Sequence, residues 1–182
     1  MIDRLTRLPV LAHGGATAVA FGAFQWVRVQ LDASYAASGH PVDYATGQLT
    51  FDARTIEGYY AVMIEAGTLD IYVRTQIIDF GFIACMMALS LLLGTLVARL
   101  GGRGSLGWRL GIGAAVLGVA GASFDVVENL LSFAMLARPQ DIPQALALAY
   151  SSAAAAKFAL LTLAMAAVPL SLVAGAVARL RG

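Results

Sequence analysis

Three polar side chains stand close together in an otherwise apolar stretch of the sequence, residues 118–132. They are Asp125, Glu128 and Asn129. On a helix, residues three and four positions apart lie on one face, so this spacing predicts a single polar stripe. Carboxylates in such a stripe can exchange protons, hold a cation through oxygen ligands, or act as general acid and base. An ionised carboxylate in hydrocarbon costs several kcal/mol, so the stripe must face protein, water or an opposite charge.

One basic residue is suitably placed to neutralise this stripe. Arginine outnumbers lysine 11 to 1, and the single lysine, Lys157, lies in the next apolar run. The turn between the two runs, residues 138–143, is short, which makes the two helices antiparallel neighbours. Asp125 and Lys157 lie at similar distances from that turn, roughly 20 Å at a rise of about 1.5 Å per residue. We therefore expect an Asp125–Lys157 ion pair near the middle of the membrane, too deep for the lysine to reach either surface.

Two further carboxylates need another partner, because one lysine neutralises only one of them. Asp79 lies about two turns inside the preceding apolar run, and Glu128 lies one turn beyond Asp125. With Asn129 they predict a polar cavity in the outer half of the bundle, open toward or covered by the external loop. Three interpretations remain open: a site for a ligand, a catalytic site, or a network that only fixes helix packing.

The elements that position these residues are predicted to be transmembrane helices. Hydrophobic residues make up 59% of the 182 residues and charged residues only 13%, against about 25% in soluble domains. Four apolar runs are long enough to cross a bilayer. The sequence therefore predicts one all-α domain, residues 1–182, in which four transmembrane helices form an up-down bundle. The predicted spans are about 8–27, 71–98, 110–136 and 145–178.

The segment at about 28–70 is the one long polar connection, and we expect it to be an external loop. Within it, Asp52 fits the N-cap of a short amphipathic helix over residues 54–66. Gly67 fits the residue that ends this helix, because glycine readily adopts the left-handed backbone found there. A short helix with tyrosines on one side suits the membrane surface or the roof of the bundle.

The arginines predict the orientation, because connections on the cytoplasmic side of a membrane are rich in basic residues. With four spans, seven of them fall on one side. Both termini are therefore expected in the cytoplasm, and the protein in the inner (plasma) membrane with several passes. These seven residues are Arg4, Arg7, Arg99, Arg103, Arg109, Arg179 and Arg181.

Several classes of function are disfavoured. A net charge of +1 provides no basic surface for nucleic acid. The single cysteine, Cys85, and the two histidines, His13 and His40, are too dispersed for a zinc centre of the usual kind. No grouping of serine, cysteine and histidine suggests nucleophilic catalysis. We therefore expect no cofactor and no bound metal.

The chain resembles a family of uncharacterised small four-span membrane proteins, mostly bacterial. The specific part of the resemblance is Asp125-Val-Val-Glu128-Asn129, followed by Lys157-Phe158 in the last span. Weaker matches are Asp52-Ala-Arg54, Gly67, Tyr72 and Asp79. The resemblance covers roughly residues 50–165, and the external loop departs from the family's pattern at residues 56–59.

The family supplies no activity, but the resemblance implies which residues act together. In this interpretation Asp52 and Arg54 cover the outer cavity as a lid, and Arg54 pairs with Asp79 or with an acidic group of a ligand. The residues implied to form one constellation are Asp52, Arg54, Asp79, Asp125, Glu128, Asn129 and Lys157.

Our first hypothesis is a membrane protein that binds or transports a small or amphipathic molecule, with a small molecule or a lipid as ligand. Four spans are few for a transporter, so this hypothesis includes a homodimer. The second is an intramembrane lipid-modifying enzyme in which Asp79 and Glu128 act as acid and base, or hold Mg²⁺ or Ca²⁺ together with Asn129. The third is a structural or assembly subunit whose polar network only fixes packing. The lack of a nucleophile makes an enzyme less favoured than a binding protein.

Overall fold

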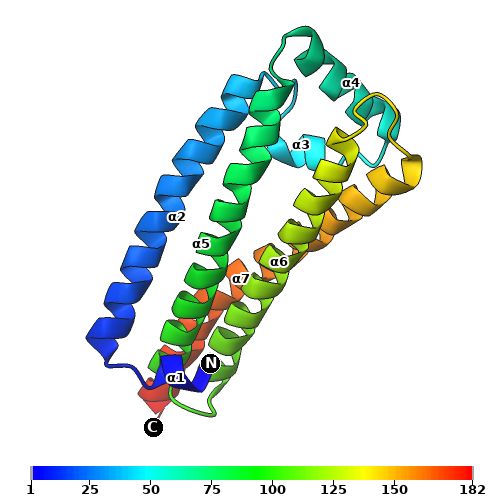
Figure 1. Ribbon diagram of the computed structural model, residues 1–182. Coiled ribbons are helices and arrows are strands. Elements are labelled where there is room, and N and C mark those ends of the chain that lie inside the picture. The colour runs from blue at the N-terminus through cyan, green and yellow to red at the C-terminus, as the bar shows by residue number, and fades with distance from the viewer. Residues whose placement is uncertain (1, 182) are drawn as a thin grey trace. The chain divides into compact units, whose positions relative to one another are not determined.

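The computed structural model of the protein describes residues 2–181, without the side chains of Asp3 and Arg181. The side chain of Arg181, on which the predicted orientation partly rests, therefore lies outside the described part. Residues 2–181 contain helices and connections but no strand. The helices, labelled in Figure 1, are α1 (Ile2–Thr6), α2 (Val10–Ser38), α3 (Tyr44–Gln48), α4 (Ala53–Glu65), α5 (Leu69–Gly101), α6 (Leu106–Leu136) and α7 (Gln144–Arg181).

Among the described residues, three helices are long and apolar enough to cross a membrane. They comprise Leu69–Gly101, Leu106–Leu136 and Gln144–Leu180, and they contain the second, third and fourth predicted spans. The first predicted span, about 8–27, falls in α2. This helix has 29 residues, but glycines, His13 and Gln25 make it less apolar than the other three. A membrane crossing by α2 therefore stays a prediction.

Helix α2 continues beyond the first predicted span, to Ser38. Residues 28–38 of the predicted external loop are therefore helical, and the end of the first membrane span at about residue 27 stays a prediction. Arg28 and Asp32 lie one turn apart on the helix, with 3.5 Å between Arg28 Nε and Asp32 Oδ2. A pair of opposite charges at this spacing supports a helix rather than ending it. The chain leaves the helix only at Gly39.

Helix α4 begins and ends at the residues predicted to bound it. The Asp52 carboxylate accepts a hydrogen bond from the backbone N–H of Thr55 at 3.0 Å, which satisfies one of the free N–H groups at the helix start. At the other end, Gly67 has φ +69°, and the backbone N–H of Thr68 donates to the carbonyl of Met63 at 2.8 Å. Glycine is favoured at such a left-handed position, and the chain turns there directly into α5.

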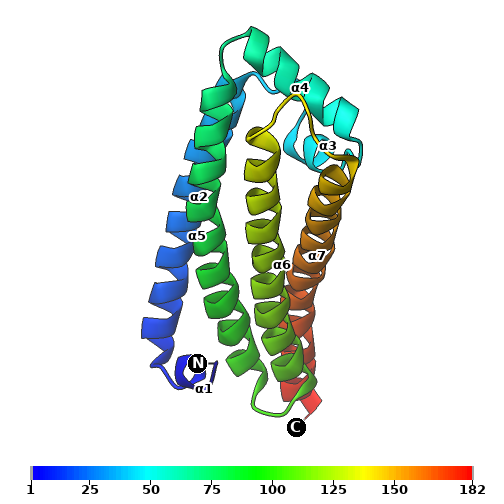
Figure 2. The same cartoon turned by 45° about the vertical axis from the view of Figure 1, so that its right-hand side comes forward.

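The chain divides into two compact units. Unit 1 comprises Met1–Gln25, Ala84–Ala122 and Phe158–Gly182, and unit 2 comprises Trp26–Ile83 and Ser123–Lys157. In unit 2, α4 lies across the ends of the α5, α6 and α7 segments, with α3 beneath it (Figures 1 and 2). The hydrophobic core of unit 2 is formed by Ala53, Ile56, Tyr60, Met63, Tyr72, Met135, Ile142, Ala147 and Tyr150.

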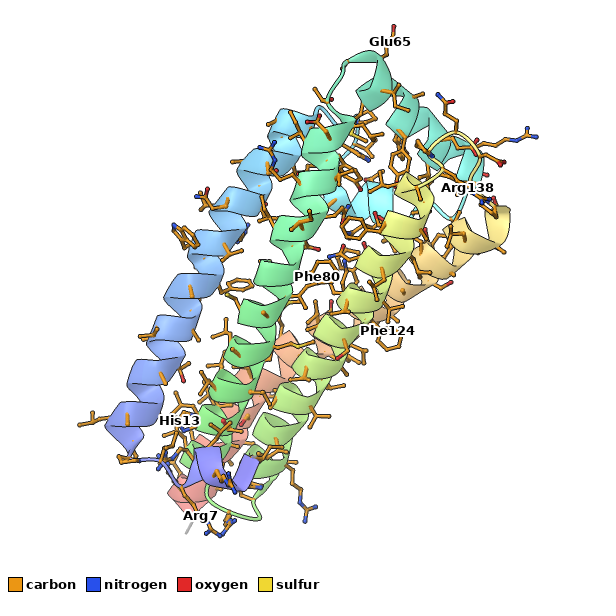
Figure 3. All side chains as sticks on the ribbon, viewed as in Figure 1. Arg7, His13, Glu65, Phe80, Phe124 and Arg138 are labelled. Atoms are coloured by element: carbon orange, nitrogen blue, oxygen red, sulfur yellow. The ribbon has the colours of Figure 1, made fainter. Side chains whose placement is uncertain are left out.

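Unit 1 is held together by close helix contacts at small residues. A Cβ atom added to Gly111 of α6 would lie 2.5 Å from the backbone nitrogen of Ala98 in α5. The two backbones therefore approach too closely to admit a side chain at this position. On α2, His13 is fully buried (Figure 3), and its Nε2 lies 3.0 Å from the carbonyl oxygen of Leu92. This hydrogen bond ties α2 to α5 within unit 1.

Candidate functional site

The predicted polar stripe lies on the buried face of α6 in unit 2. Asp125 is 3% exposed, whereas the preceding residue, Phe124, is 41% exposed and points away from α6 (Figure 3). Glu128 and Asn129 are also buried. Because these three positions follow the helical repeat, α6 brings all three side chains to one face.

Lys157 of α7 is the centre of this cluster. Its Nζ lies 2.9 Å from Asp125 Oδ1, so the predicted ion pair is present. Lys157 also donates to Glu128 Oε2. This second contact differs from our expectation that Glu128 would lie apart from the lysine. The two carboxylates are three positions apart on one helix face, which lets both reach the same ammonium group.

A third partner of Lys157 comes from the short helix α3. Lys157 Nζ donates a hydrogen bond to Gln48 Oε1 at 3.0 Å. Gln48 could not be predicted as a partner from the sequence, because the segment at residues 40–51 has no apolar periodicity, and a glutamine in a polar connection carries no signal of burial. The ammonium thus has acceptors from α3 as well as from α6.

Asp79 of α5 joins the cluster through Asn129. Asn129 Nδ2 donates to Asp79 Oδ2 at 2.7 Å. The other end of the same amide, Asn129 Oδ1, is buried and has no hydrogen-bond partner among the residues that the structure describes. A buried acceptor without a donor costs about 1–3 kcal/mol. This atom would therefore gain a hydrogen bond from a donor on a water molecule or a ligand.

The charges of the cluster do not balance. Three buried carboxylates, Asp79, Asp125 and Glu128, share a single ammonium group. Within residues 2–180, no arginine is paired with them. If all three carboxylates were ionised, two negative charges would be uncompensated in a desolvated site, at several kcal/mol each. The cluster is thus suited to take up positive charge, as protons or as a cationic group.

The two loop residues that the resemblance implied to act with the cluster, Asp52 and Arg54, lie on the exposed side of the start of α4. Asp52 is exposed at the start of α4, where hydrogen bonds from the side chain and backbone of Thr55 hold its pKa below the usual range. Arg54 is exposed on the same helix, and in the described part of the chain no hydrogen bond or ion pair joins it to Asp79. Because Asp52 caps α4, it is held at the helix end and away from the cluster.

A small pocket adjoins the cluster at Gln48, which both lines the pocket and accepts the hydrogen bond from Lys157. Its volume is about 10 Å³, close to that needed by one water molecule. The chain has six tyrosines, and all of them line this pocket, together with His40. No local sequence pattern predicts this grouping, because the rings come from five separate helices. They are Tyr35, Tyr44, Tyr59, Tyr60, Tyr72 and Tyr150.

The pocket is electrically neutral but lies in the field of the carboxylates. Burial lowers the pKa of His40, which keeps its ring uncharged near neutral pH. Burial and, after it, the negative charge of Asp79 raise the pKa of the Tyr44 hydroxyl. Burial raises the pKa of Tyr60 as well, and the Glu128 carboxylate adds to this rise. The hydroxyls of Tyr44 and Tyr60 therefore remain protonated, and both residues lie close enough to the cluster to interact with its negative charge.

The described residues contain no group of three or more histidine, cysteine, aspartate or glutamate side chains arranged to hold a metal ion. Beside Glu128, the place that a divalent cation would take is next to the Lys157 ammonium, which would repel it. The geometry therefore gives no support to a magnesium or calcium site formed by Asp79, Glu128 and Asn129.

No protein-family model, no curated protein and no solved structure significantly matches this chain.

Proposed function

We propose that the chain is a multi-pass membrane protein that binds or transports a small or amphipathic molecule at the polar cluster of unit 2. In this proposal α2 crosses the membrane together with α5, α6 and α7, both termini are cytoplasmic, and the membrane is the inner (plasma) membrane. The three long apolar helices support a membrane location. The arginines near residues 99–109 and near the termini support the orientation.

The imbalance of the cluster is the observation that carries this proposal. Three buried carboxylates surround one ammonium, and Asn129 Oδ1 lacks a donor in the described part of the chain. A network that serves packing alone gains stability only when its charges are paired and its hydrogen bonds are made. Groups held at a cost to stability are typical of functional sites. The cluster therefore fits a site completed by a proton or by a ligand group.

The substitution Asp79→Asn tests whether the buried Asp79 carboxylate lowers the stability of the folded protein. The amide has the same shape and can still pair with Asn129, but it removes one uncompensated buried charge. We expect the melting temperature in detergent to equal or exceed that of the wild type, by about 2–4 °C for each kcal/mol gained. The control is Asp70→Asn, an exposed carboxylate in the first turn of the same helix, which should leave the melting temperature unchanged or slightly lower.

The opposite result would support a network with a structural role alone. If Asp79→Asn lowers the melting temperature as strongly as removal of the Lys157 ammonium, then the Asp79 carboxylate stabilises the fold. The imbalance would then be only apparent, and the proposed binding function would lose its main support.

A further inference from the structure

We infer that the tyrosine-lined pocket of unit 2 binds an organic ammonium group, the positively charged end of a small or amphipathic ligand. This inference rests on the proposed function and adds the chemical class of the ligand. The face of an aromatic ring carries partial negative charge, and proteins bind substituted ammonium ions by surrounding them with such faces. All six tyrosines of the chain line this one pocket.

The rings form one connected aromatic wall. The ring centroids of Tyr35 and Tyr44 are 3.7 Å apart, and the centroid of His40 is 5.2 Å from that of Tyr59 and 5.3 Å from that of Tyr72. The Tyr35 hydroxyl donates to the carbonyl of Val42 at 2.6 Å, which fixes its orientation. These rings come from α2, α4 and α5 and from the segment carrying α3, so the fold brings them together from distant parts of the sequence.

The charge around the pocket favours a cation over an anion. No lysine or arginine lines the pocket, and the Lys157 ammonium is occupied by Asp125, Glu128 and Gln48. The adjoining carboxylates exceed the ammonium by two. A carboxylate or phosphate group would be repelled from such a site, whereas an ammonium group would gain from both the rings and the excess negative charge.

The pocket, at about 10 Å³, is too small in this structure for an organic ammonium ion and must widen to admit one, and the segment at residues 40–51 is the candidate for that movement. It contributes His40, Tyr44 and Gln48 to the lining. The backbone is left-handed on either side of it, with φ +67° at Gly39, the residue before the segment, and φ +57° at Phe51, its last residue. For a residue other than glycine this conformation costs about 1–3 kcal/mol, so release of Phe51 would relieve strain.

Two hydrogen bonds to α7 hold the end of this segment, Phe51, in place. The Phe51 backbone N–H donates to Ser151 Oγ at 3.0 Å, and its carbonyl accepts from Gln144 Nε2 at 2.8 Å. Both partners belong to α7. Movement of α3 away from the aromatic wall would require these contacts to break, together with the hydrogen bonds of Tyr35 to the Val42 carbonyl, Tyr44 to the Leu31 carbonyl and Lys157 to Gln48.

Calorimetric titration of the full-length protein in dodecyl maltoside tests the inference. The probes are choline and 3,3-dimethyl-1-butanol, an alcohol of the same shape without the charge. We expect choline to bind at least about tenfold more tightly than the alcohol, because only the ammonium interacts with the ring faces and the carboxylates. Equal affinities for the two probes, or no binding of choline by the wild type, would overturn the inference.

A pair of variants at Tyr59 tests the role of the rings. Tyr59 is half-buried at the pocket, so a change there is tolerable for folding, and the melting temperature of each variant checks this. We expect Tyr59→Leu to weaken choline binding about fivefold to thirtyfold and Tyr59→Phe to weaken it less than about threefold, since phenylalanine keeps the ring. Unchanged affinity in Tyr59→Leu would show that choline binds elsewhere and would overturn the inference.

Lipid nanodiscs distinguish the two sources of an ammonium group. If the ligand is a lipid headgroup, phosphatidylcholine discs should compete with choline and phosphatidylglycerol discs should not. If it is a free amine, choline should bind equally in both. Either result supports an ammonium site. If choline does not bind but Asp79→Asn is as stable as the wild type or more so, the ammonium inference fails while the proposed binding function stands.

Discussion

At the scale of the residue, Lys157 determines how much the buried carboxylates of the cluster reduce the stability of the fold. Its ammonium contacts two buried carboxylates, those of Asp125 and Glu128. A buried ion pair adds little when compared with a well-packed apolar pair, but removing one partner leaves a buried charge without compensation. The effect of a substitution here therefore depends on whether the opposite charges are removed with it.

We expect Lys157→Met to destabilise the protein by about 3–5 kcal/mol, because it leaves the carboxylates without a counter-ion. Combining it with Asp125→Asn and Glu128→Gln should restore most of that loss. Chemical unfolding in detergent measures both variants. The control is Arg28→Met, which removes a surface ion pair whose side chains are 57% and 55% exposed and should cost less than about 1 kcal/mol. Equal losses for Lys157→Met and Arg28→Met would contradict the assigned role of Lys157.

Part of the cluster could be predicted from the sequence. Asp125 and Lys157 flank a short turn at similar distances, so helix geometry alone brings them together. The contact of Lys157 with Gln48 could not be predicted, because it depends on how a non-periodic segment folds back over the helices. The tyrosine pocket could not be predicted either, because its rings come from five helices and no local pattern links them.

At the scale of the element, local backbone signals predicted both ends of α4. Asp52 and Gly67 bound α4 as expected, because a cap and a left-handed glycine act through neighbouring backbone atoms. Arg28 and Asp32 lie within α2, beyond the first predicted span. Exposed opposite charges one turn apart are compatible with a helix, so they do not mark where it ends.

The contact between α5 and α6 in unit 1 leads to a paired prediction on one helix. Gly111→Ala should destabilise the protein by about 1–3 kcal/mol, because its Cβ would lie 2.5 Å from a backbone atom of Ala98 that cannot move aside. Gly113→Ala places its Cβ where no atom lies within 4 Å, and it should be neutral or stabilising by up to about 1 kcal/mol. Melting temperatures in detergent compare the two. If both variants are neutral, the close approach of α5 and α6 is refuted.

At the scale of the whole molecule, the two units differ in the chemistry they bury. Among the described residues, all four buried charged side chains belong to unit 2: Asp79, Asp125, Glu128 and Lys157. Unit 1 buries His13 and small residues that allow close helix contacts. Composition was enough to predict apolar helices suited to a membrane, whereas the concentration of charge in one unit depends on the fold. We therefore assign the chemistry to unit 2 and packing to unit 1.

Native mass spectrometry of the protein extracted in mild detergent tests the central claim most directly. The claim is that the carboxylates of unit 2 form a binding site rather than a packing network. We expect a small molecule or lipid to remain bound to the wild type and to Asp70→Asn, and to be lost from Asp79→Asn although that variant is at least as stable. Equal retention by the wild type and Asp79→Asn, or no bound molecule on the wild type, would contradict the claim.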